Sequence, residues 1–367
     1  VHISTFAFNA CYGAHRFYYS CKHKRRILYL CEAKVHKMPA LPIIAISIGD
    51  PNGVGVEIIL KTFQDRTLFE KCIPVVYASI DFVQKQQVLY NTHVPLSLME
   101  GMPKQGVLNI AAIWKDTPEL DFGKQTTMAG VAAFESLQAA AVAVQKKQAD
   151  ALVTAPINKA TITSLDFPFA GHTHYLAALW GGDALMLLAH NKLRVALLTD
   201  HIPLHKVTAA ITIDLIKRKA IQLSKTLQQD FGCQIPRMAL LGLNPHASDQ
   251  GVIGNQDDAI LKPAVAELKN QGVLLTGPFA ADSFFGQKHY TNFDAVLSCY
   301  HDQGLVGFKT LAFGQGVNVT TGLPFVRTSP DHGTAFDISG KGVANHDSFA
   351  VAVQMACTIY SNRQKTD

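Results

Sequence analysis

Closely spaced cysteines are missing from this sequence. None of its seven cysteines forms a pair separated by two residues, and Cys72, Cys233, Cys299 and Cys357 are scattered through apolar stretches. This spread excludes a disulfide framework and a structural zinc knuckle, and it is typical of small core residues in a reducing compartment. We therefore expect a cytoplasmic protein.

Long apolar runs and standard nucleotide-binding loops are also lacking. No apolar run approaches the roughly 18 residues that a membrane helix needs, so we expect no membrane span. The glycine-rich segment "GDPNGVG" at 49–55 has neither the dinucleotide-binding fingerprint nor the lysine of a phosphate-binding loop. A simple turn from a strand into a helix explains its glycines equally well.

Charge is sparse and unevenly placed. Charged residues make up 17% of the 367 residues, and the net charge is +5. Seven basic residues and one acidic residue lie in the segment 1–37, so the remaining chain holds 26 basic and 27 acidic residues. A nearly neutral body offers no electrostatic footprint for nucleic acid, and we expect no such partner.

The segment 1–37 needs its own interpretation. It mixes aromatic and basic residues without the period of a helix or a strand, and it lacks the continuous apolar region of a secretory signal. We interpret it as translated upstream sequence or a disordered tail, with the folded protein beginning near Met38. A basic targeting arm is the alternative.

Apolar residues make up 48% of the sequence, which is enough for a substantial core in two domains or one large α/β unit. Runs of β-branched residues alternate with longer amphipathic stretches, which is typical of an α/β fold with a largely parallel sheet. No low-complexity linker or internal repeat interrupts this pattern. The pattern predicts strands at 43–49, 73–79, 151–156, 193–199, 237–243, 293–299 and 316–321, and helices at 128–148, 214–232, 256–272 and 347–365.

Three of the predicted strands end just before a histidine. "LRVALLTD" leads into His201, "MALLGLNP" into His246 and "DAVLSCY" into His301. Ligands of open α/β sheets bind outside the carboxyl ends of the strands, and three neutral imidazoles at one point would form an open site for Zn²⁺ or Co²⁺. Alternatively, each histidine caps a turn. Spacing alone cannot show that the three meet, so both interpretations stay open.

A second glycine-rich segment, 313–335, indicates an anion site. Glycine lets the backbone approach an anion closely, and Lys309 and Arg327 would provide positive charge for a phosphate. Taken singly, a basic residue of this kind is more often a solvated surface charge.

Six stretches, in matching order and spacing, carry a resemblance to a known family. From about Leu41 to the C-terminus the sequence resembles the 4-hydroxythreonine-4-phosphate dehydrogenase family of the pyridoxal phosphate pathway. The six stretches are "GHTHYLA", "GLNPHA", "GPFAADSFF", "YHDQGLVGFK", "GVNVTTGLPFVRTSPDHGTA" and "GKGVANHDSF".

The resemblance implies an activity. It implies NAD- or NADP-dependent oxidation of 4-(phosphooxy)-L-threonine to 2-amino-3-oxo-4-(phosphooxy)butanoate, which decarboxylates to 3-amino-2-oxopropyl phosphate. It also implies a homodimer whose active site lies at the interface. The alternatives are a 4-phospho-D-threonate or 4-phospho-D-erythronate dehydrogenase of the same superfamily and, from another class, a three-histidine zinc aldolase of sugar phosphates.

The resemblance also implies roles for individual residues. One divalent metal ion, zinc, magnesium or cobalt, is expected on the three strand-end histidines. Substrate contacts are expected at His172, Thr173, Lys309, Asn318 and Arg327.

Four further residues have implied or ambiguous roles. Lys309 either binds phosphate or relays the alcohol proton. Asp282 and Asp302 are candidates for orienting a histidine through its second nitrogen, although turn capping explains them equally well. His174 stands where the family usually has an acid, which leaves the substrate less certain.

The fold implied by the resemblance is a two-domain α/β/α architecture similar to isocitrate and isopropylmalate dehydrogenases, which bind NAD without the Rossmann fingerprint. One domain is expected at 38–150 together with about 315–367, and the other at 151–314. By this analogy the adenosine end of the cofactor is held by five residues. They are His332, Gly333, Thr334, Ala335 and Asn345.

Overall fold

The computed structural model describes residues 41–115, 118–163, 169 and 171–366. The segment 1–37 lies outside these described residues, so its interpretation stays a prediction. Leu41–Asp367 group into one unit.

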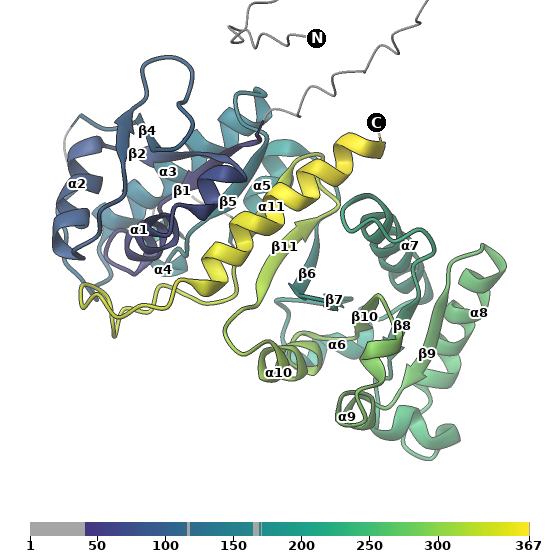
Figure 1. Cartoon of the computed structure of the whole chain (residues 1–367). Coiled ribbons are helices and arrows are strands. Elements are labelled where there is room, and N and C mark those ends of the chain that lie inside the picture. The colour runs from purple at the N-terminus through teal and green to yellow at the C-terminus, as the bar shows by residue number, and fades with distance from the viewer. Residues whose placement is uncertain (1–40, 116–117, 164–168, 170, 367) are drawn as a thin grey trace, which may run out of the picture. The chain divides into compact units, whose positions relative to one another are not determined.

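The described strands form a single twelve-stranded sheet in the order β3-β4-β2-β1-β5-β12-β11-β6-β7-β10-β8-β9 (Figure 1). The pairs β6–β7, β6–β11 and β11–β12 are antiparallel, and the other pairs are parallel. This arrangement confirms the α/β class and the largely parallel sheet. The strands are β1 (Ile43–Ser47), β2 (Ile73–Ala78), β3 (Leu96–Leu98), β4 (Leu108–Ala112), β5 (Ala151–Thr154), β6 (Leu185–His190), β7 (Leu193–Leu197), β8 (Met238–Leu241), β9 (Leu275–Phe279), β10 (Ala295–Ser298), β11 (Val317–Thr321) and β12 (Val326–Pro330).

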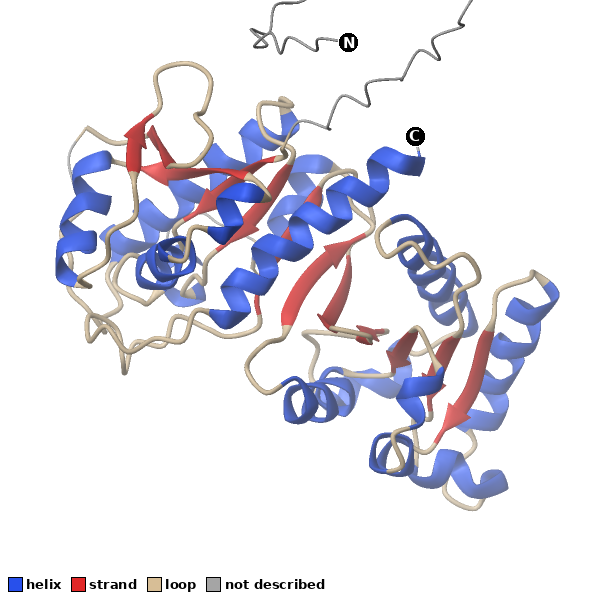
Figure 2. Cartoon of the chain, in the orientation of Figure 1, coloured by secondary structure: helices blue, strands red, loops and turns tan. Residues whose placement is uncertain are grey.

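Helices connect and cover the strands (Figure 2). The predicted helix at 256–272 is present as a π-helical turn, η3, followed directly by α8. The helices are α1 (Gly55–Gln64), η1 (Thr67–Glu70), α2 (Ile80–Leu89), α3 (Thr127–Gln145), α4 (Lys159–Thr163), α5 (His172–Trp180), α6 (Leu204–Ala210), α7 (Ile213–Gln229), η2 (Pro245–Gly251), η3 (Asp257–Leu261), α8 (Lys262–Asn270), α9 (Ala281–Gly286), η4 (His289–Asn292), α10 (His301–Ala312) and α11 (Asp347–Thr366).

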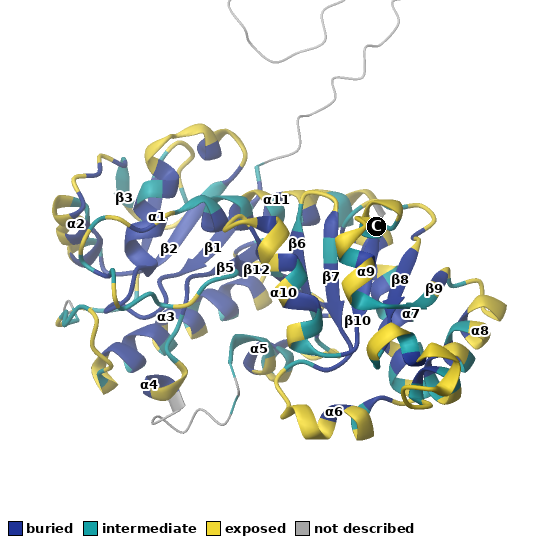
Figure 3. Cartoon of the chain, turned by 90° about the horizontal axis from the view of Figure 1, so that it is seen from below, coloured by how far each residue is buried: buried dark blue, intermediate teal, exposed yellow. Residues whose placement is uncertain are grey.

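The core lies on both faces of the sheet because side chains alternate along each strand. On β1, Ile44 and Ile46 belong to a cluster that includes Phe63 of α1 and Phe349 of α11. Ala45, between them, belongs to a separate cluster with residues of α3. Figure 3 shows β1 as buried, whereas α6 is largely exposed.

The helix α3 bears on the expectation that the chain has no membrane span. By length and composition it is the one helix among the described residues that could cross a membrane. More than half of the relevant window is buried inside the protein, and α3 contacts β1, β2 and β5. A core helix passes the same test of composition, and these contacts make α3 a core helix.

The predicted division into two domains stays a prediction. β5, the first strand of the predicted second domain, pairs with β1 and β12 of the predicted first domain. The sheet is therefore continuous across residue 150. What matters for the site is that β11 and β12 lie in the middle of this sheet, between β5 and β6.

Candidate functional site

The three predicted histidines follow three neighbouring parallel strands. β10 pairs in parallel with both β7 and β8, so the carboxyl ends of the three strands lie at one edge of the sheet. His201 follows β7, His301 begins α10 directly after β10, and His246 lies in the turn after β8. The side chain of Gln303 ties this edge together, because its Nε2 donates to the Gly242 carbonyl and its Oε1 accepts from the Cys299 amide at 2.7 Å.

Two of these histidines lie side by side. The ring centroids of His201 and His301 are 5.6 Å apart. Nδ1 of His301 donates to Oδ1 of Asp302 at 2.7 Å, and Nδ1 of His201 lies 3.8 Å from Asp200. His201 also holds the pKa of the Asp200 carboxyl below its usual range by hydrogen bonding. A carboxylate that accepts from Nδ1 favours the tautomer in which Nε2 can bind a metal, and this hydrogen bond is present for His301.

The third histidine lines a different cavity. His246 and Asp282 line a cavity of about 720 Å³, whereas His201 and His301 line one of about 750 Å³, and Asp302 borders both. Among the described residues, no three His, Cys, Asp or Glu side chains are close enough to hold a metal ion. The three-histidine metal site and the orienting role of Asp282 therefore stay predictions, whereas the contact between Asp302 and His301 is present.

A buried carboxylate holds the turn that carries His246. His246 has a φ of +51°, and the four residues after it are also left-handed. Asp257 is fully buried and accepts hydrogen bonds from the amides of Leu243 and Asn244, at 2.8 and 3.1 Å, and from the Ser248 hydroxyl at 2.6 Å. Left-handed conformations cost free energy in residues other than glycine, so a network of this kind is needed to hold the turn.

Arg327 is a buried cation on β12, in the middle of the sheet. It is only 2% exposed, and its guanidinium donates to the hydroxyls of Thr154 and Thr320. Neither partner is charged, and burial lowers the pKa of Arg327 to about 9. A buried charge is costly unless an opposite charge compensates it, so this guanidinium is prepared for an anionic ligand.

The cavity of about 750 Å³ brings together nine of the fourteen predicted site residues. They are His172, Thr173, His201, His301, Lys309, Asn318, Arg327, His332 and Gly333. His174, the departure from the family pattern, also lines this cavity and is exposed.

Several polar atoms in this cavity are buried without a hydrogen-bond partner among the described residues. These atoms are Nε2 of His172, Oδ1 of Asn318 and Nε2 of His332. Burial, together with the charges of Arg327 and Lys159, lowers the pKa of His172, which keeps that imidazole neutral. Buried polar groups are normally paired, so these atoms indicate a polar ligand in the cavity.

Lys309 links the cavity to the predicted cofactor segment. It lies in the last turn of α10, and its Nζ donates to the carbonyl of Asp331 at 2.9 Å. His332 and Gly333 follow Asp331 and line the cavity, whereas Thr334, Ala335 and Asn345 do not. The structure thus places the first part of the predicted cofactor segment in the cavity and the rest outside it.

Sequence reasoning missed the residues that support the site. Thr154 and Thr320 hold Arg327, and Asp257 holds the turn of His246. Thr154 is the last residue of β5, so the rule that strand ends carry the site would have found it. No sequence signal indicates Asp257, because its partners are set by the tertiary fold.

Comparisons with known proteins show which family the chain is similar to. The family model "Pyridoxal phosphate biosynthetic protein PdxA" matches residues 70–356. A curated protein of Bacteroides thetaiotaomicron, named 4-hydroxythreonine-4-phosphate dehydrogenase, is 44% identical over 326 residues, covering 88% of this chain and 90% of its own. A curated protein of the same name from Sulfurihydrogenibium sp. is 41% identical over 316 residues, covering 85% of this chain and 97% of its own.

Solved structures of two dehydrogenases are similar to this chain along most of its length. A crystal structure of 4-hydroxythreonine-4-phosphate dehydrogenase from Klebsiella pneumoniae matches with a TM-score of 0.77 and 34% identity, covering 87% of this chain and 99% of its own. A crystal structure of a terephthalate 1,2-cis-dihydrodiol dehydrogenase from Burkholderia xenovorans matches with a TM-score of 0.58 and 25% identity, covering 87% of this chain and 98% of its own.

Proposed function

We propose, on the premise that this chain belongs to the family of the pyridoxal phosphate biosynthetic protein PdxA, that it oxidises 4-(phosphooxy)-L-threonine at its C3 hydroxyl with NAD or NADP. The product, 2-amino-3-oxo-4-(phosphooxy)butanoate, then loses CO₂ to give 3-amino-2-oxopropyl phosphate. The named relatives are dehydrogenases, which favours oxidation over the aldol cleavage considered from the sequence.

The observation that carries this proposal is the buried, unneutralised guanidinium of Arg327. The side chains within hydrogen-bond distance of it are neutral hydroxyls. A phosphate or carboxylate group of the substrate would accept hydrogen bonds from this planar donor and compensate its charge. The buried Oδ1 of Asn318 and Nε2 of His172 would then bind polar hydrogens or hydroxyls of the same substrate.

The proton of the C3 hydroxyl needs an acceptor within the cavity. Lys309 lines the cavity and ends in a flexible ammonium, so in its neutral form it would take this proton, and in its charged form it would bind phosphate. His172 stays neutral beside Arg327 and Lys159, and it therefore orients the substrate without adding charge.

The chemistry of the donor set fits a divalent metal ion. His201 and His301 are adjacent, and each has a carboxylate on its Nδ1 side, which favours metal binding through Nε2. We propose that zinc, magnesium or cobalt binds these two histidines together with His246. When bound there, the ion would act as a Lewis acid beside the reacting alcohol.

We further propose that the segment from His332 to Ala335, with Asn345, binds the adenosine end of NAD, in an arrangement like that of isocitrate and isopropylmalate dehydrogenases. The support is local: His332 and Gly333 line the cavity, and Nε2 of His332 is buried without a partner among the described residues.

We also propose that two chains form a homodimer with the active site at their interface. Large apolar side chains are exposed in the chain segments that follow each of the three histidines, and exposed apolar side chains that gather in one patch mark interaction surfaces in soluble proteins. They are Ile202 and Leu204 after His201, Val252 after His246, and Val306 and Phe313 after His301.

We also propose a cytoplasmic location. The four described cysteines are free thiols, which is typical of proteins in a reducing compartment.

The activity is tested by NADH absorbance with purified protein and one added metal. We expect NADH to form with 4-(phosphooxy)-L-threonine and not with 4-phospho-D-threonate. NADH formation from phosphothreonate alone would assign the chain to the sister activity. Release of an aldehyde without NADH would overturn oxidation as the reaction.

The metal site is tested by the His246→Ala variant. We expect it to lose bound metal and turnover and to keep its circular dichroism spectrum, because the side chain lines a cavity and not the core. His93→Ala, at an exposed position, is the control. Full metal content in the His246→Ala protein would remove His246 from the ligand set.

A further inference from the structure

The helix α1 contacts both ends of the predicted cofactor segment. At its start, the amide of Val54 donates to the carbonyl of Thr334 at 3.0 Å. A Cβ atom at Gly53 would lie 2.8 Å from the same carbonyl oxygen, so only glycine allows this approach. The segment "GDPNGVG", which the sequence left ambiguous, thus serves as a contact surface for the loop that carries Thr334.

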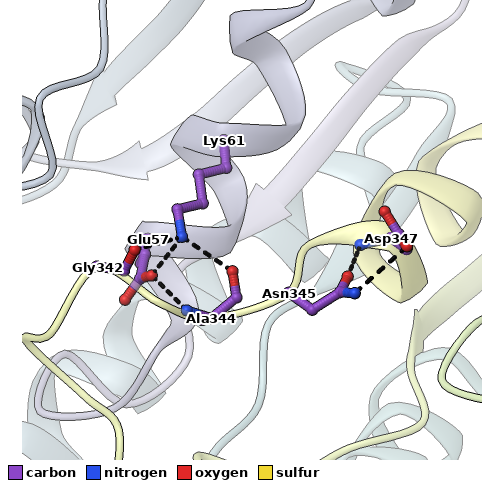
Figure 4. Close-up of polar contacts among 6 residues, drawn as sticks. All are labelled: Glu57, Lys61, Gly342, Ala344, Asn345 and Asp347. Atoms are coloured by element: carbon purple, nitrogen blue, oxygen red, sulfur yellow. Dashed lines mark hydrogen bonds and ion pairs between the residues drawn. The ribbon is translucent and has the colours of Figure 1, made fainter.

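One turn further along α1, two charged side chains hold the other end of the segment. Nζ of Lys61 donates to Oε1 of Glu57 at 2.7 Å and to the carbonyls of Gly342 and Ala344, each at 2.9 Å. Oε1 of Glu57 in turn accepts the amide of Ala344 at 2.7 Å. Figure 4 shows this network between α1 and the loop before α11.

The burial of this pair distinguishes it from an ordinary surface ion pair. The side chain of Glu57 is fully buried, and that of Lys61 is 20% exposed. All three donors of the ammonium group are used, and two of them bind loop carbonyls. Such a pair costs desolvation free energy and gives little net stability, so stabilising α1 alone does not account for it.

The network of Glu57 and Lys61 fixes Ala344, the residue directly before Asn345. On the other side, Oδ1 of Asn345 accepts the amide of Asp347, the first residue of α11, at 2.7 Å. Asn345 is therefore held between an anchor on α1 and the start of α11. Its backbone position depends on the anchor at Ala344, which Glu57 and Lys61 supply.

We propose that Glu57 and Lys61 are positioning residues that hold the segment 342–345 in the conformation that binds the adenosine end of the nicotinamide cofactor. This inference rests on the proposed function. Neither residue lines the cavity that contains Arg327, so their effect falls on the cofactor and not on the phosphorylated substrate.

The test compares NAD⁺ binding with phosphate binding in the full-length protein. The variants are Lys61→Met, which keeps the apolar stem and removes the three donors, and Glu57→Gln, which keeps an acceptor oxygen for the Ala344 amide. Lys217→Met is the matched control, because Lys217 forms an ion pair with Glu267 on the surface. Dissociation constants for NAD⁺ and for inorganic phosphate are measured by calorimetry, and exchange of the Ala344 amide by NMR.

Lys61→Met should weaken NAD⁺ binding about tenfold, and Glu57→Gln about threefold, because hydrogen bonds to charged groups hold the segment. Phosphate affinity should stay within about twofold of the wild type in both variants, and Ala344 should exchange faster. If Lys61→Met is insoluble, Glu57→Gln decides the question.

Two results would overturn the inference. One is an unchanged dissociation constant for NAD⁺ in a folded variant. The other is an equal loss of NAD⁺ and phosphate affinity, which would indicate a general loss of structure. A wild-type protein that binds no NAD⁺ or NADP⁺ would instead contradict the proposed function, so the two failures are distinguishable.

Discussion

Oγ1 of Thr154 accepts two hydrogen bonds from Arg327, one from Nε at 3.2 Å and one from Nη2 at 2.7 Å. Thr154 ends β5 and Arg327 lies on the adjacent strand β12, so the pairing of the two strands fixes the orientation of the guanidinium. A hydroxyl orients this group without neutralising it. The full positive charge remains available to a ligand in the cavity.

Arg327→Ala should raise the KM for the phosphorylated substrate about a hundredfold, since hydrogen bonds to charged groups contribute about 1.5–3 kcal/mol each. Turnover at saturation should fall much less. Steady-state kinetics with 4-(phosphooxy)-L-threonine and with unphosphorylated 4-hydroxythreonine measure the effect. Arg218→Ala, on the exposed side of α7, is the control. Normal discrimination between the two substrates would contradict the anion-binding role.

The sequence predicted seven of the twelve strands of the sheet and missed β3, β4, β6, β9 and β12. All seven predicted strands are present, and Gly232 and Gly272 follow α7 and α8 with φ values of +70° and +78°. β12 was missed because its sequence, "VRTSP", is polar although every residue in it is buried. Its polar side chains are satisfied by contacts that only the fold creates, such as the bond from the Thr328 hydroxyl to the Ala352 carbonyl.

The site was predictable where strand direction determines it. The rule for carboxyl ends of parallel strands placed the three histidines at one edge of the sheet and left open whether they meet, and the structure brings His201 and His301 side by side. The rule did not predict that His246 would line another cavity, because the left-handed turn at 246–250 is held by hydrogen bonds to Asp257 that only the fold creates. A hydrophobic pattern also cannot show which hydroxyls surround a buried guanidinium.

Asp257→Ala should destabilise the protein by about 3 kcal/mol, because buried donors lose their charged acceptor. It should also reduce metal content, since the turn that carries His246 would lose its support. Urea unfolding and metal analysis measure the two effects. Asp258→Ala is a matched control, because the neighbouring Asp258 pairs with Lys262 at the surface. Equal metal content in both variants would show that the network does not position His246.

Leu204→Glu should convert the proposed dimer to a monomer and abolish turnover. The side chain is 71% exposed in the single chain, so the substitution leaves the monomer fold intact, whereas burying an unpaired charge at an interface is strongly unfavourable. Sedimentation velocity measures the assembly state. Met102→Glu is the control, because Met102 is 81% exposed and distant in sequence from the three histidines. A dimeric Leu204→Glu protein would exclude this surface from the interface.

The neutral state of His172 predicts a dependence of stability on pH. Burial, followed by the charges of Arg327 and Lys159, lowers the pKa of His172 in the folded protein, whereas in the unfolded chain this pKa is about 6.5. Below that value the unfolded state binds a proton that the folded state does not, so stability falls as the pH falls. The contribution is largely present above about pH 6.5, and its loss is at most about 1.4 kcal/mol per pH unit, which is the slope for uptake of one proton. His172→Asn removes this term, and its free energy of unfolding should decrease less steeply than that of the wild type between about pH 7 and about pH 5.5. Urea titrations at several pH values measure both slopes, and equal slopes would show that His172 becomes protonated in the folded protein.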